Sequence, residues 1–283
     1  MMRFITYSNP LPGEDFLGGL KYVVMAATFF KRVYPDGEVY CATSGDLPEE
    51  LRPTIKPIKF PFLDQPFAQA RVNFQMQYLT SELFNAPTIF AGRDVLFCNE
   101  IGGGLGDELA VTNYRFHGSM PYCSDFFYVR PPRTPDERRQ VHECFREYYR
   151  AVSWMPEVIR DSWADQLALA GVLGMPEDSE FTGSLIYAPR KAHIRALPAD
   201  PWFLTPEDFF TAKLTDHMKK PNGPHSSSFD EDSYQDFLAH KYMLHFKGNR
   251  KHMMFGFTKW ASKHGHISIP DLFPDLPMGY LDD

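Results

Sequence analysis

The chain lacks paired cysteines, long apolar runs and an excess of basic charge. Its four cysteines, Cys41, Cys98, Cys123 and Cys144, are far apart and form no C-x-x-C pair, so nothing supports a zinc ribbon or a redox couple. We expect them to be buried, reduced thiols. No run of about 18 apolar residues occurs, and the first residues form no apolar signal segment. These absences predict a soluble, cytoplasmic protein without a membrane span.

The charge balance is acidic, with 29 Lys and Arg residues against 36 Asp and Glu residues and a formal net charge of -7. Bulk binding of nucleic acid is not expected, because no cationic excess is available to displace counterions from a phosphate backbone. Any anion site must therefore be local. The 283 residues are 43% hydrophobic and 15% aromatic, which indicates a folded globular protein.

Strand-like and helix-like segments alternate through the first hundred residues. Apolar spacing predicts strands at 3–7, 38–42 and 55–60 and helices at 17–34 and 68–84. The third strand contains or adjoins three prolines, so it is expected at a sheet edge. Two apolar runs then flank the trio Gly92-Arg93-Asp94. This order predicts an α/β fold with a mostly parallel, twisted, doubly wound sheet, in which ligands bind beyond the C-terminal strand ends.

The second half of the chain is less regular. Helices are predicted at 134–149 and 162–173, the first with Pro135 in its opening turn. Residues 213–232 are polar and rich in turn formers, which predicts a mobile loop. The glycine run at 101–106 lacks the Lys-Ser/Thr of a P-loop, and Asp107 stands where a dinucleotide fingerprint needs its third glycine. A flexible surface turn is the preferred interpretation of that run.

Two polar sites each have an ordinary explanation as well as a functional one. Asp94 lies between apolar runs, where an Asp is commonly a cap or a turn residue, and it becomes a metal-ligand candidate when another ligand converges on it. Asp165 and Gln166 lie at the start of a predicted helix. A carboxylate there also complements the helix dipole without any catalytic role.

A basic cluster near the C-terminus reads HFKGNRK and covers residues 245–251. His245 follows an apolar segment, where such a residue is commonly structural, and a Lys-Arg run is commonly a solvated face. Gly248 favours a ligand-binding site instead, because a glycine lets the backbone approach a ligand closely. Lys247, Arg250 and Lys251 are suited to binding paired phosphates.

The spacing His245-x-x-Gly248-x-x-Lys251 resembles the H-x-x-G-x-x-K motif near the C-terminus of GT-A fold glycosyltransferases, particularly those of glycosyltransferase family 8. Residues 90–97 align with the Asp-x-Asp region of that family as F-x-G-x-D-V-L-F. Further segments resemble the family in the same order, at residues 107–115, 121–129, 165–167 and 197–206. The resemblance extends from Arg3 to about Trp260.

This resemblance implies one GT-A, Rossmann-like domain over residues 1–283. A nucleotide-sugar-binding half would cover about 1–100, and an irregular acceptor-side half with the diphosphate-binding motif would cover about 101–283. The implied activity is transfer of a hexosyl or pentosyl group, with retention, from a nucleotide-diphosphate sugar to a hydroxyl of a glycan or another acceptor. The implied cofactor is a divalent cation, Mn or Mg.

The resemblance also assigns roles to individual residues. Asp94 and His245 become metal ligands, and Asp165 and Gln166 become the catalytic pair that orients donor and acceptor. The implied nucleotide-sugar site consists of Thr6, Tyr7, Ser8, Asn9, Arg71, Gly92, Arg93, Asp94, Lys247, Gly248, Arg250 and Lys251. The loop at 213–232 is expected to close over the donor as a lid.

Two positions depart from the family pattern. Gly92 stands where the first Asp of the Asp-x-Asp motif belongs, which leaves at most two protein ligands for the cation. The cation then binds weakly, requires the nucleotide, or is replaced by charge from basic residues such as Arg93. Cys123 and Asp125 stand where the family has Asn-x-Gly, so the acceptor contacts are expected to differ.

Two other classes of protein remain open. One is a non-catalytic protein of the same fold that binds nucleotide sugars or glycans. The other is a metal-assisted pyrophosphate or phosphodiester hydrolase that uses Asp94 and His245, although that chemistry commonly needs more clustered carboxylates and histidines than these segments contain.

Overall fold

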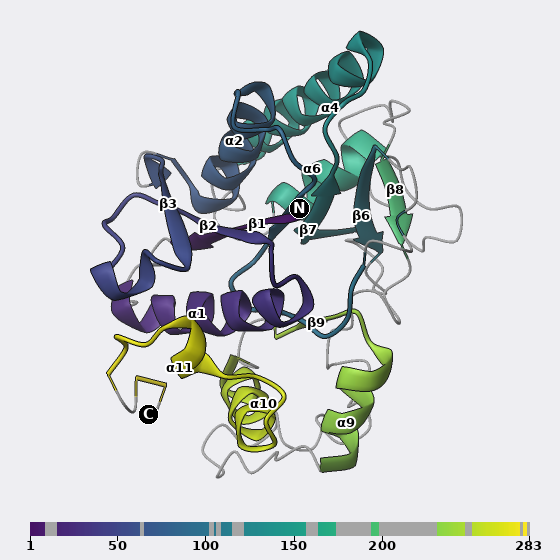
Figure 1. The fold of residues 1–283 in the computed structure, drawn as a ribbon. Helices are drawn as coiled ribbons and strands as arrows, with labels where there is room; N and C mark the ends of the chain where they lie inside the picture. Colours follow the sequence, from purple (N-terminus) through teal and green to yellow (C-terminus); the bar gives the residue numbers. More distant parts are fainter. Residues whose placement is uncertain are drawn as a thin grey trace.

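The computed structural model describes residues 1–8, 16–62, 65–101, 105, 109–114, 122–156, 164–173, 194–197, 231–246, 251–277 and 280–281. Its larger sheet contains β1 (Arg3–Ser8), β2 (Glu38–Thr43), β3 (Ile55–Lys59), β4 (Thr88–Ala91), β6 (Ala110–Tyr114), β7 (Tyr122–Val129) and β8 (Ile194–Leu197). The strands lie in the order β3-β2-β1-β4-β7-β6-β8 (Figure 1).

Strand pairing is mostly parallel, as the sequence predicts. The strands from β3 through β4 are parallel to one another, and β8 is parallel to β6. Only β7, among the described strands of this sheet, runs antiparallel to its neighbours β4 and β6. The predicted edge position of β3 is confirmed, and it suits Pro57, which has no backbone N–H to donate to a further strand.

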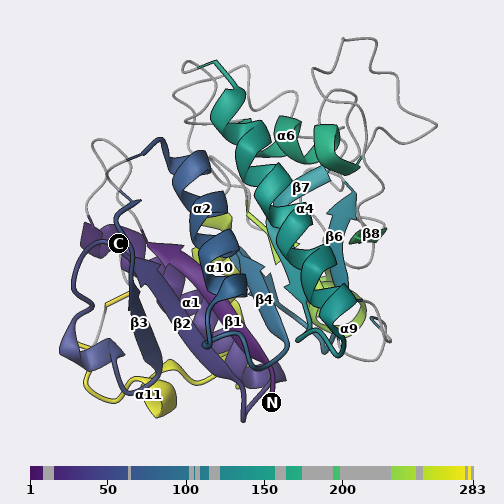
Figure 2. The same ribbon diagram turned by 90° about the horizontal axis from the view of Figure 1, so that it is seen from above.

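Helices cover both faces of the sheet (Figures 1 and 2). Successive buried side chains on the strands alternate between two apolar clusters: Phe4 and Ile89 belong to one, Ile5 and Phe90 to the other. The first cluster packs against α1 (Phe16–Val33), α9 (Glu231–His240), α10 (Lys251–Lys263) and α11 (Ile269–Leu272). The second packs against α2 (Phe67–Thr80), α4 (Pro135–Trp154) and α6 (Ala164–Leu173).

Helix α1 is enclosed by protein on two sides, which explains its nearly continuous apolar sequence. The Phe30 ring lies 5.2 Å from that of Phe4 on the sheet, and the Phe29 ring stacks 5.4 Å from that of Phe257 on α10. Helix α1 is thus a rigid layer between the sheet and the C-terminal helices.

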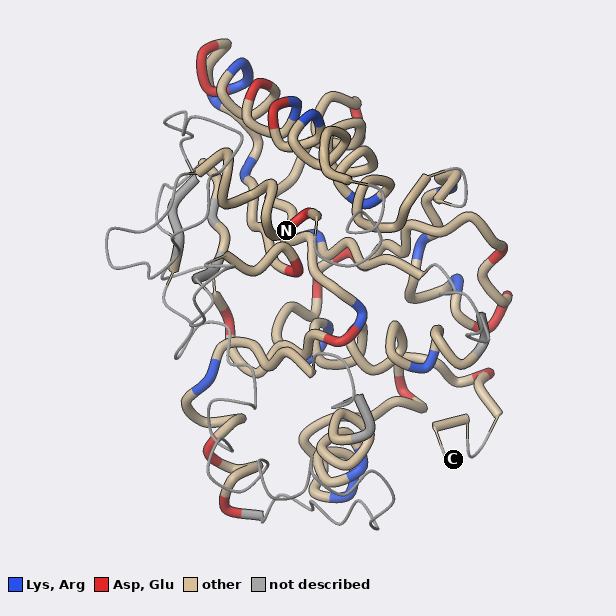
Figure 3. The backbone as a smooth tube through the Cα atoms, turned by 180° about the vertical axis from the view of Figure 1, so that it is seen from behind, with Lys and Arg blue, Asp and Glu red and all other residues tan. Residues whose placement is uncertain are grey.

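The boundaries of two predicted helices need correction. Helix α2 ends at Thr80 rather than at residue 84, because Ser81 already has an extended backbone. Helix α4 continues to Trp154, five residues beyond the predicted end. Its start was correctly predicted: Thr134 caps the helix by accepting a hydrogen bond from the Glu137 backbone N–H. Acidic and basic residues are interspersed along this helix (Figure 3).

A second, two-stranded sheet lies beside α1. It pairs β5 (Val95–Phe97) with β9 (Met243–His245) in antiparallel register. A short 3-10 helix, η1 (Glu49–Leu51), precedes β3. Of the predicted mobile loop at 213–232, only the last two residues are described, and they begin α9.

The described cysteines carry free thiols, as expected, and all but the half-buried Cys144 are buried. Burial raises the pKa of the Cys41 and Cys98 thiols to about 12, which keeps them protonated and unreactive. Within the described residues, no helix combines the length and apolar character needed to cross a bilayer.

Glu38 joins the N-terminal ends of three parallel strands. Its carboxylate lies 2.8 Å from the buried Arg3 guanidinium on β1 and 2.5 Å from the Lys56 ammonium on β3. The hydrogen bond from Lys56, opposed by burial and reinforced by Arg3, lowers the pKa of Glu38 from an ordinary 4.5 to about 2. The ionised carboxylate therefore stabilises the folded state.

Replacing Glu38 with Gln should lower the free energy of unfolding at pH 7 by about 1 to 2 kcal/mol, after allowance for solvent screening. A depressed folded-state pKa contributes stability above the unfolded-state value, and that contribution is lost as the pH falls from about 4.5 to 2. Urea unfolding at pH 7, 5 and 3 measures the difference, with Glu50→Gln on exposed η1 as the control. If Glu38→Gln lowered the free energy of unfolding by the same amount at all three pH values, the stabilising role of the ionised Glu38 carboxylate would be contradicted.

Candidate functional site

The site is built around the sharp connection between β4 and β5. Gly92, Arg93 and Asp94 form this connection, and the Val95 N–H donates back to the Gly92 carbonyl at 3.3 Å. Because β4 is parallel to β1, the bend lies just beyond the C-terminal ends of both strands. This is the edge where ligands bind in open α/β sheets, as the sequence predicts for the trio.

Strand β9 brings His245 to Asp94 from 151 positions further along the chain. His245 pairs with Val95 in the β5–β9 ladder, and the Phe246 N–H donates to the Asp94 carbonyl at 2.8 Å. The His245 Nε2 atom then lies 3.6 Å from Asp94 Oδ1, and the histidine is only 1% exposed. The two predicted metal ligands are therefore brought together.

Strand β7 adds Asp125 on the other side of the bend. The Gly92 N–H donates to the Asp125 carbonyl at 3.1 Å. The β6–β7 ladder is irregular here. Asn113 pairs with Cys123 and Val111 pairs with Tyr128, so a two-residue step along β6 corresponds to a five-residue step along β7. Such bulges redirect side chains and are common beside functional sites. Asp125 Oδ2 lies 3.5 Å from His245 Nε2.

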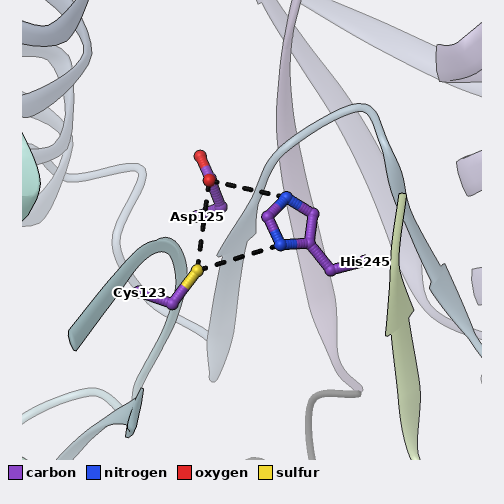
Figure 4. A group of neighbouring side chains, drawn as sticks. All are labelled: Cys123, Asp125 and His245. Atoms are coloured by element: carbon purple, nitrogen blue, oxygen red, sulfur yellow. Dashed lines mark hydrogen bonds and ion pairs between the residues drawn. The ribbon is translucent and has the colours of Figure 1, made fainter. Parts of the chain in front are cut away.

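Cys123, Asp125 and His245 form a compact group (Figure 4). The three side chains form a triangle, in which the Cys123 sulfur lies 4.0 Å from Asp125 Oδ2 and the imidazole turns its two nitrogens toward different partners. Nε2 faces the Asp125 carboxylate, whereas Nδ1 lies 4.0 Å from the Cys123 sulfur. Carboxylate, imidazole and thiol are all potential metal ligands. Neither Cys123 nor Asp125 is among the metal ligands that the sequence predicts.

Arg71 joins this group to α6. From the buried middle of α2 its guanidinium donates to the carboxylates of Asp125 and Asp165, and Nη2 also donates to Ser124 Oγ at 2.8 Å. Burial is the largest influence and lowers the pKa of Arg71, but Asp125, Tyr148 and Tyr7 together outweigh it, so the pKa is raised. Arg71 was predicted to contact the donor diphosphate. In this structure its described partners are protein carboxylates and a serine hydroxyl.

Asp165 and Gln166 lie in the first turn of α6, directly after Ala164, and are 2% and 3% exposed. Asp165 Oδ1 accepts a hydrogen bond from the Gln166 backbone N–H at 2.8 Å, while Oδ2 is paired with Arg71. Complementing the helix dipole therefore does not fully explain this acid. A buried carboxylate held by a guanidinium fork has a fixed position, which suits an orienting role.

The end of β1 differs in character from the acid cluster. Tyr7 lies edge-on to Phe62 and Phe74 inside the second apolar cluster, and its hydroxyl accepts a hydrogen bond from Gln75 at 2.9 Å. Burial raises its pKa, so the phenol stays neutral. Thr6 and Ser8 are fully buried. Contact of these residues with a nucleotide base stays a prediction.

Arg93 turns away from Asp94 toward α1. Its guanidinium lies against Gly19, where any Cβ would collide with it, and 5.7 Å from the centre of the Tyr22 ring. The side chain is 8% exposed. Arg93 thus lies near Ser8 at the end of β1, and among the described contacts it is not adjacent to the carboxylates.

Several predicted binding residues lie outside the described residues. These are Asn9, Lys247, Gly248 and Arg250. Lys251 is described only through its backbone, as the first residue of α10. Their roles toward a diphosphate remain predictions.

Comparison with known proteins supports the architecture. Neither models of protein families nor curated proteins give a match. Among solved structures, the galactosyltransferase LgtC, in complex with donor and acceptor sugar analogues, is 14% identical with a TM-score of 0.53, covering 95% of this chain and 96% of LgtC. The glycosyltransferase GlyE of Streptococcus pneumoniae TIGR4 is 10% identical with a TM-score of 0.53, covering 94% of this chain and 64% of GlyE. The chain has the GT-A fold of these enzymes.

Removing the Arg71 guanidinium should destabilise the protein strongly. In Arg71→Met the buried Asp165 and the mostly buried Asp125 lose their cation, which costs about 3 to 5 kcal/mol in the free energy of unfolding. The matched control is Arg139→Met, which breaks an exposed ion pair on α4 and should change stability very little. Urea unfolding compares the two variants at pH 7, and equal stabilities would contradict this description of the site.

Proposed function

We propose that this protein is a glycosyltransferase that moves a hexosyl or pentosyl group from a nucleotide-diphosphate sugar to an acceptor hydroxyl. The observation that carries the proposal is the approach of Asp94 and His245 at the C-terminal edge of the sheet, in a fold shared with LgtC and GlyE. The Asp165–Gln166 pair, tied to the same place through Arg71 and Asp125, supplies the rest of the site.

Asp94 and His245 are suited to holding a divalent cation such as Mn or Mg. One offers a carboxylate oxygen and the other an imidazole nitrogen, both at the edge where a donor diphosphate would lie. When bound, such a cation neutralises the charge that grows on the leaving diphosphate. In this proposal Lys247, Arg250 and Lys251 add positive charge beside the leaving diphosphate. Gly248 allows the backbone to approach that diphosphate closely.

Asp165 and Gln166 orient the reacting groups rather than attack the sugar. The Arg71 fork fixes the Asp165 carboxylate, and the hydrogen bond from the Gln166 backbone fixes the first turn of α6. Donor and acceptor are then held without reorganisation during the reaction. The acceptor side also includes Asp125 and Cys123, where the resembled family has Asn-x-Gly.

The reaction exchanges one bond to the anomeric carbon for another. The bond from this carbon to the β-phosphate oxygen breaks as the acceptor oxygen bonds to the same carbon. The acceptor proton passes to the leaving phosphate, so the products are the glycoside and a free nucleoside diphosphate. Retention of anomeric configuration is part of the proposal, because Asp165-Gln166 resembles the pair found in a retaining family.

Turnover with a panel of nucleotide sugars tests the proposal. Release of free nucleotide is measured with UDP-, GDP- and dTDP-sugars, with a CMP-sugar as a monophosphate control that should not react. Asp165→Asn should lower kcat by about 100-fold or more because the oriented charge is lost. The control Asp136→Asn lies on the exposed start of α4 and should be as active as the unaltered protein.

The outcomes separate the alternative functions. Nucleotide binding without release would indicate a non-catalytic binding protein. Release at the same rate with and without any acceptor, accompanied by free sugar or sugar phosphate, would indicate a hydrolase. The absence of both turnover and a nucleotide-dependent thermal shift would overturn the transferase assignment.

Cation dependence is tested separately. Dialysis against a chelator should abolish turnover, and added Mn2+ should restore it, because Asp94 and His245 alone do not carry positive charge to the diphosphate. Asp94→Asn should require about 10-fold or more Mn2+ for half-maximal activity. Asp36→Asn, in the exposed turn before β2, is the control. Turnover that survives the chelator would assign the neutralising role to the basic residues instead.

A further inference from the structure

Gly92 and Asp125 occupy complementary positions across the β4–β7 pairing. Ala91 is opposite Phe126, and the next backbone contact is the hydrogen bond from Gly92 N–H to the Asp125 carbonyl. A glycine is therefore found where the resembled family has an acid, and an acid is found where that family has a glycine. The two positions are neighbours in space although they are 33 residues apart in sequence.

The space beside Gly92 is already used by two carboxylates. A Cβ atom added there would lie 2.6 Å from Asp94 Oδ1 and 3.7 Å from both Cβ and Oδ1 of Asp125. A methyl group would already force the Asp94 carboxylate to move. A full aspartate at 92 would extend further into the space that the Asp94 and Asp125 side chains occupy.

His245 lies within reach of both carboxylates but is not tightly bonded to either. Its Nε2 atom is 3.5 Å from Asp125 Oδ2 and 3.6 Å from Asp94 Oδ1, both longer than an ordinary N–H···O hydrogen bond. Two ligands at right angles on one Mg2+ or Mn2+ ion are about 3 Å apart, given bonds of about 2.1 Å. His245 Nε2 therefore faces one carboxylate oxygen from each side of the bend.

Asp125 divides its two oxygens between two functions. Oδ1 accepts from Arg71, and Oδ2 is the oxygen that faces His245. The carboxylates of Asp125 and Asp165 pair with the Arg71 guanidinium, and the Asp94 carboxylate faces His245. Three carboxylates and one guanidinium sum to a formal charge of -2. A divalent cation balances that charge.

We propose that Asp125 supplies the carboxylate that position 92 lacks, so that Asp94, Asp125 and His245 bind one hard divalent cation. In this arrangement the second carboxylate ligand comes from the bulge in β7 instead of the end of β4. The absence of a side chain at Gly92 leaves space for the Asp125 carboxylate. This inference rests on the proposed sugar transfer, because the cation it places is the one that would meet the donor diphosphate.

Cys123 lies outside this ligand set. Its sulfur lies 4.0 Å from His245 Nδ1 and 4.0 Å from Asp125 Oδ2. Both carboxylates face Nε2 instead, and a single ion binds through only one imidazole nitrogen. Carboxylate oxygens suit Mn2+ and Mg2+, whereas a thiolate selects softer metals. Loss of the Cys123 sulfur should therefore leave Mn2+ binding intact.

Mn2+ binding without donor or acceptor tests the ligand set directly. Electron paramagnetic resonance of free Mn2+, titrated with protein, gives the dissociation constant. Asp125→Asn keeps the shape of the side chain and an oxygen that accepts from Arg71. Both Asp125→Asn and Asp94→Asn should weaken Mn2+ binding about 10-fold or more. Cys123→Ser and Asp36→Asn should stay within about twofold of the unaltered protein. Thermal melting without metal verifies that each variant is folded.

Exchanging the two positions provides the sharper test. Asp125→Gly alone should weaken Mn2+ binding. The double variant Gly92→Asp with Asp125→Gly should bind Mn2+ more tightly than Asp125→Gly, because loss of the Asp125 side chain leaves room for the displaced Asp94 carboxylate and for the carboxylate introduced at position 92. Gly92→Asp alone should not strengthen binding, since Asp94 and Asp125 already occupy the space.

The outcomes distinguish this inference from the proposed function. Mn2+ affinity unchanged in Asp125→Asn would overturn the inference even if sugar transfer is observed. Loss of Mn2+ affinity in Cys123→Ser with unchanged affinity in Asp94→Asn would also overturn the inference, because the ion would then bind on the side of His245 that faces the thiol. Affinity lost in both aspartate variants supports it even if no donor in the panel turns over.

Discussion

The antiparallel pairing of β5 with β9 is the constraint on which the candidate site depends. It joins segments about 150 residues apart, and the hydrogen bond from Phe246 N–H to the Asp94 carbonyl fixes their register where β5 begins and β9 ends. A one-residue slip would turn His245 to the opposite face of the ladder. The apolar side chains of this small sheet belong to the same buried cluster as those of α1 and α10, so the sheet is packed as part of the core.

Arg71 provides the second constraint, since it lets three acids share one small volume. Buried carboxylates repel one another unless a cation is placed among them, and the guanidinium fork on α2 satisfies Asp125 and Asp165 at once. Helix α6, strand β7 and helix α2 are therefore connected through charge as well as through apolar packing. Asp94 and Asp125 both face His245, at the edge of the sheet where a ligand would arrive.

The sequence predicted the parts of this structure that follow local rules. The apolar periodicity of 3–7, 17–34 and 38–42 and the prolines near β3 were sufficient for the parallel half, and the spacing of Asp94 and His245 within resembling segments was sufficient to pair them. Asp125 was noticed only as a departure from a family pattern. Its place beside Gly92 depends on antiparallel β7 and on a bulge, neither of which has a signature in the local sequence. The same holds for Arg71, whose buried acidic partners are 54 and 94 residues away.

An anomalous difference map shows directly whether Asp94, Asp125 and His245 bind one cation, with crystals soaked in Mn2+ and the nucleoside diphosphate released from the reacting donor. We expect one strong peak at about 2.1 Å from Asp94 Oδ1, Asp125 Oδ2 and His245 Nε2, with diphosphate oxygens completing the shell. A bound nucleotide with no Mn2+ peak between these three side chains, or with the peak at another group of residues, would contradict it.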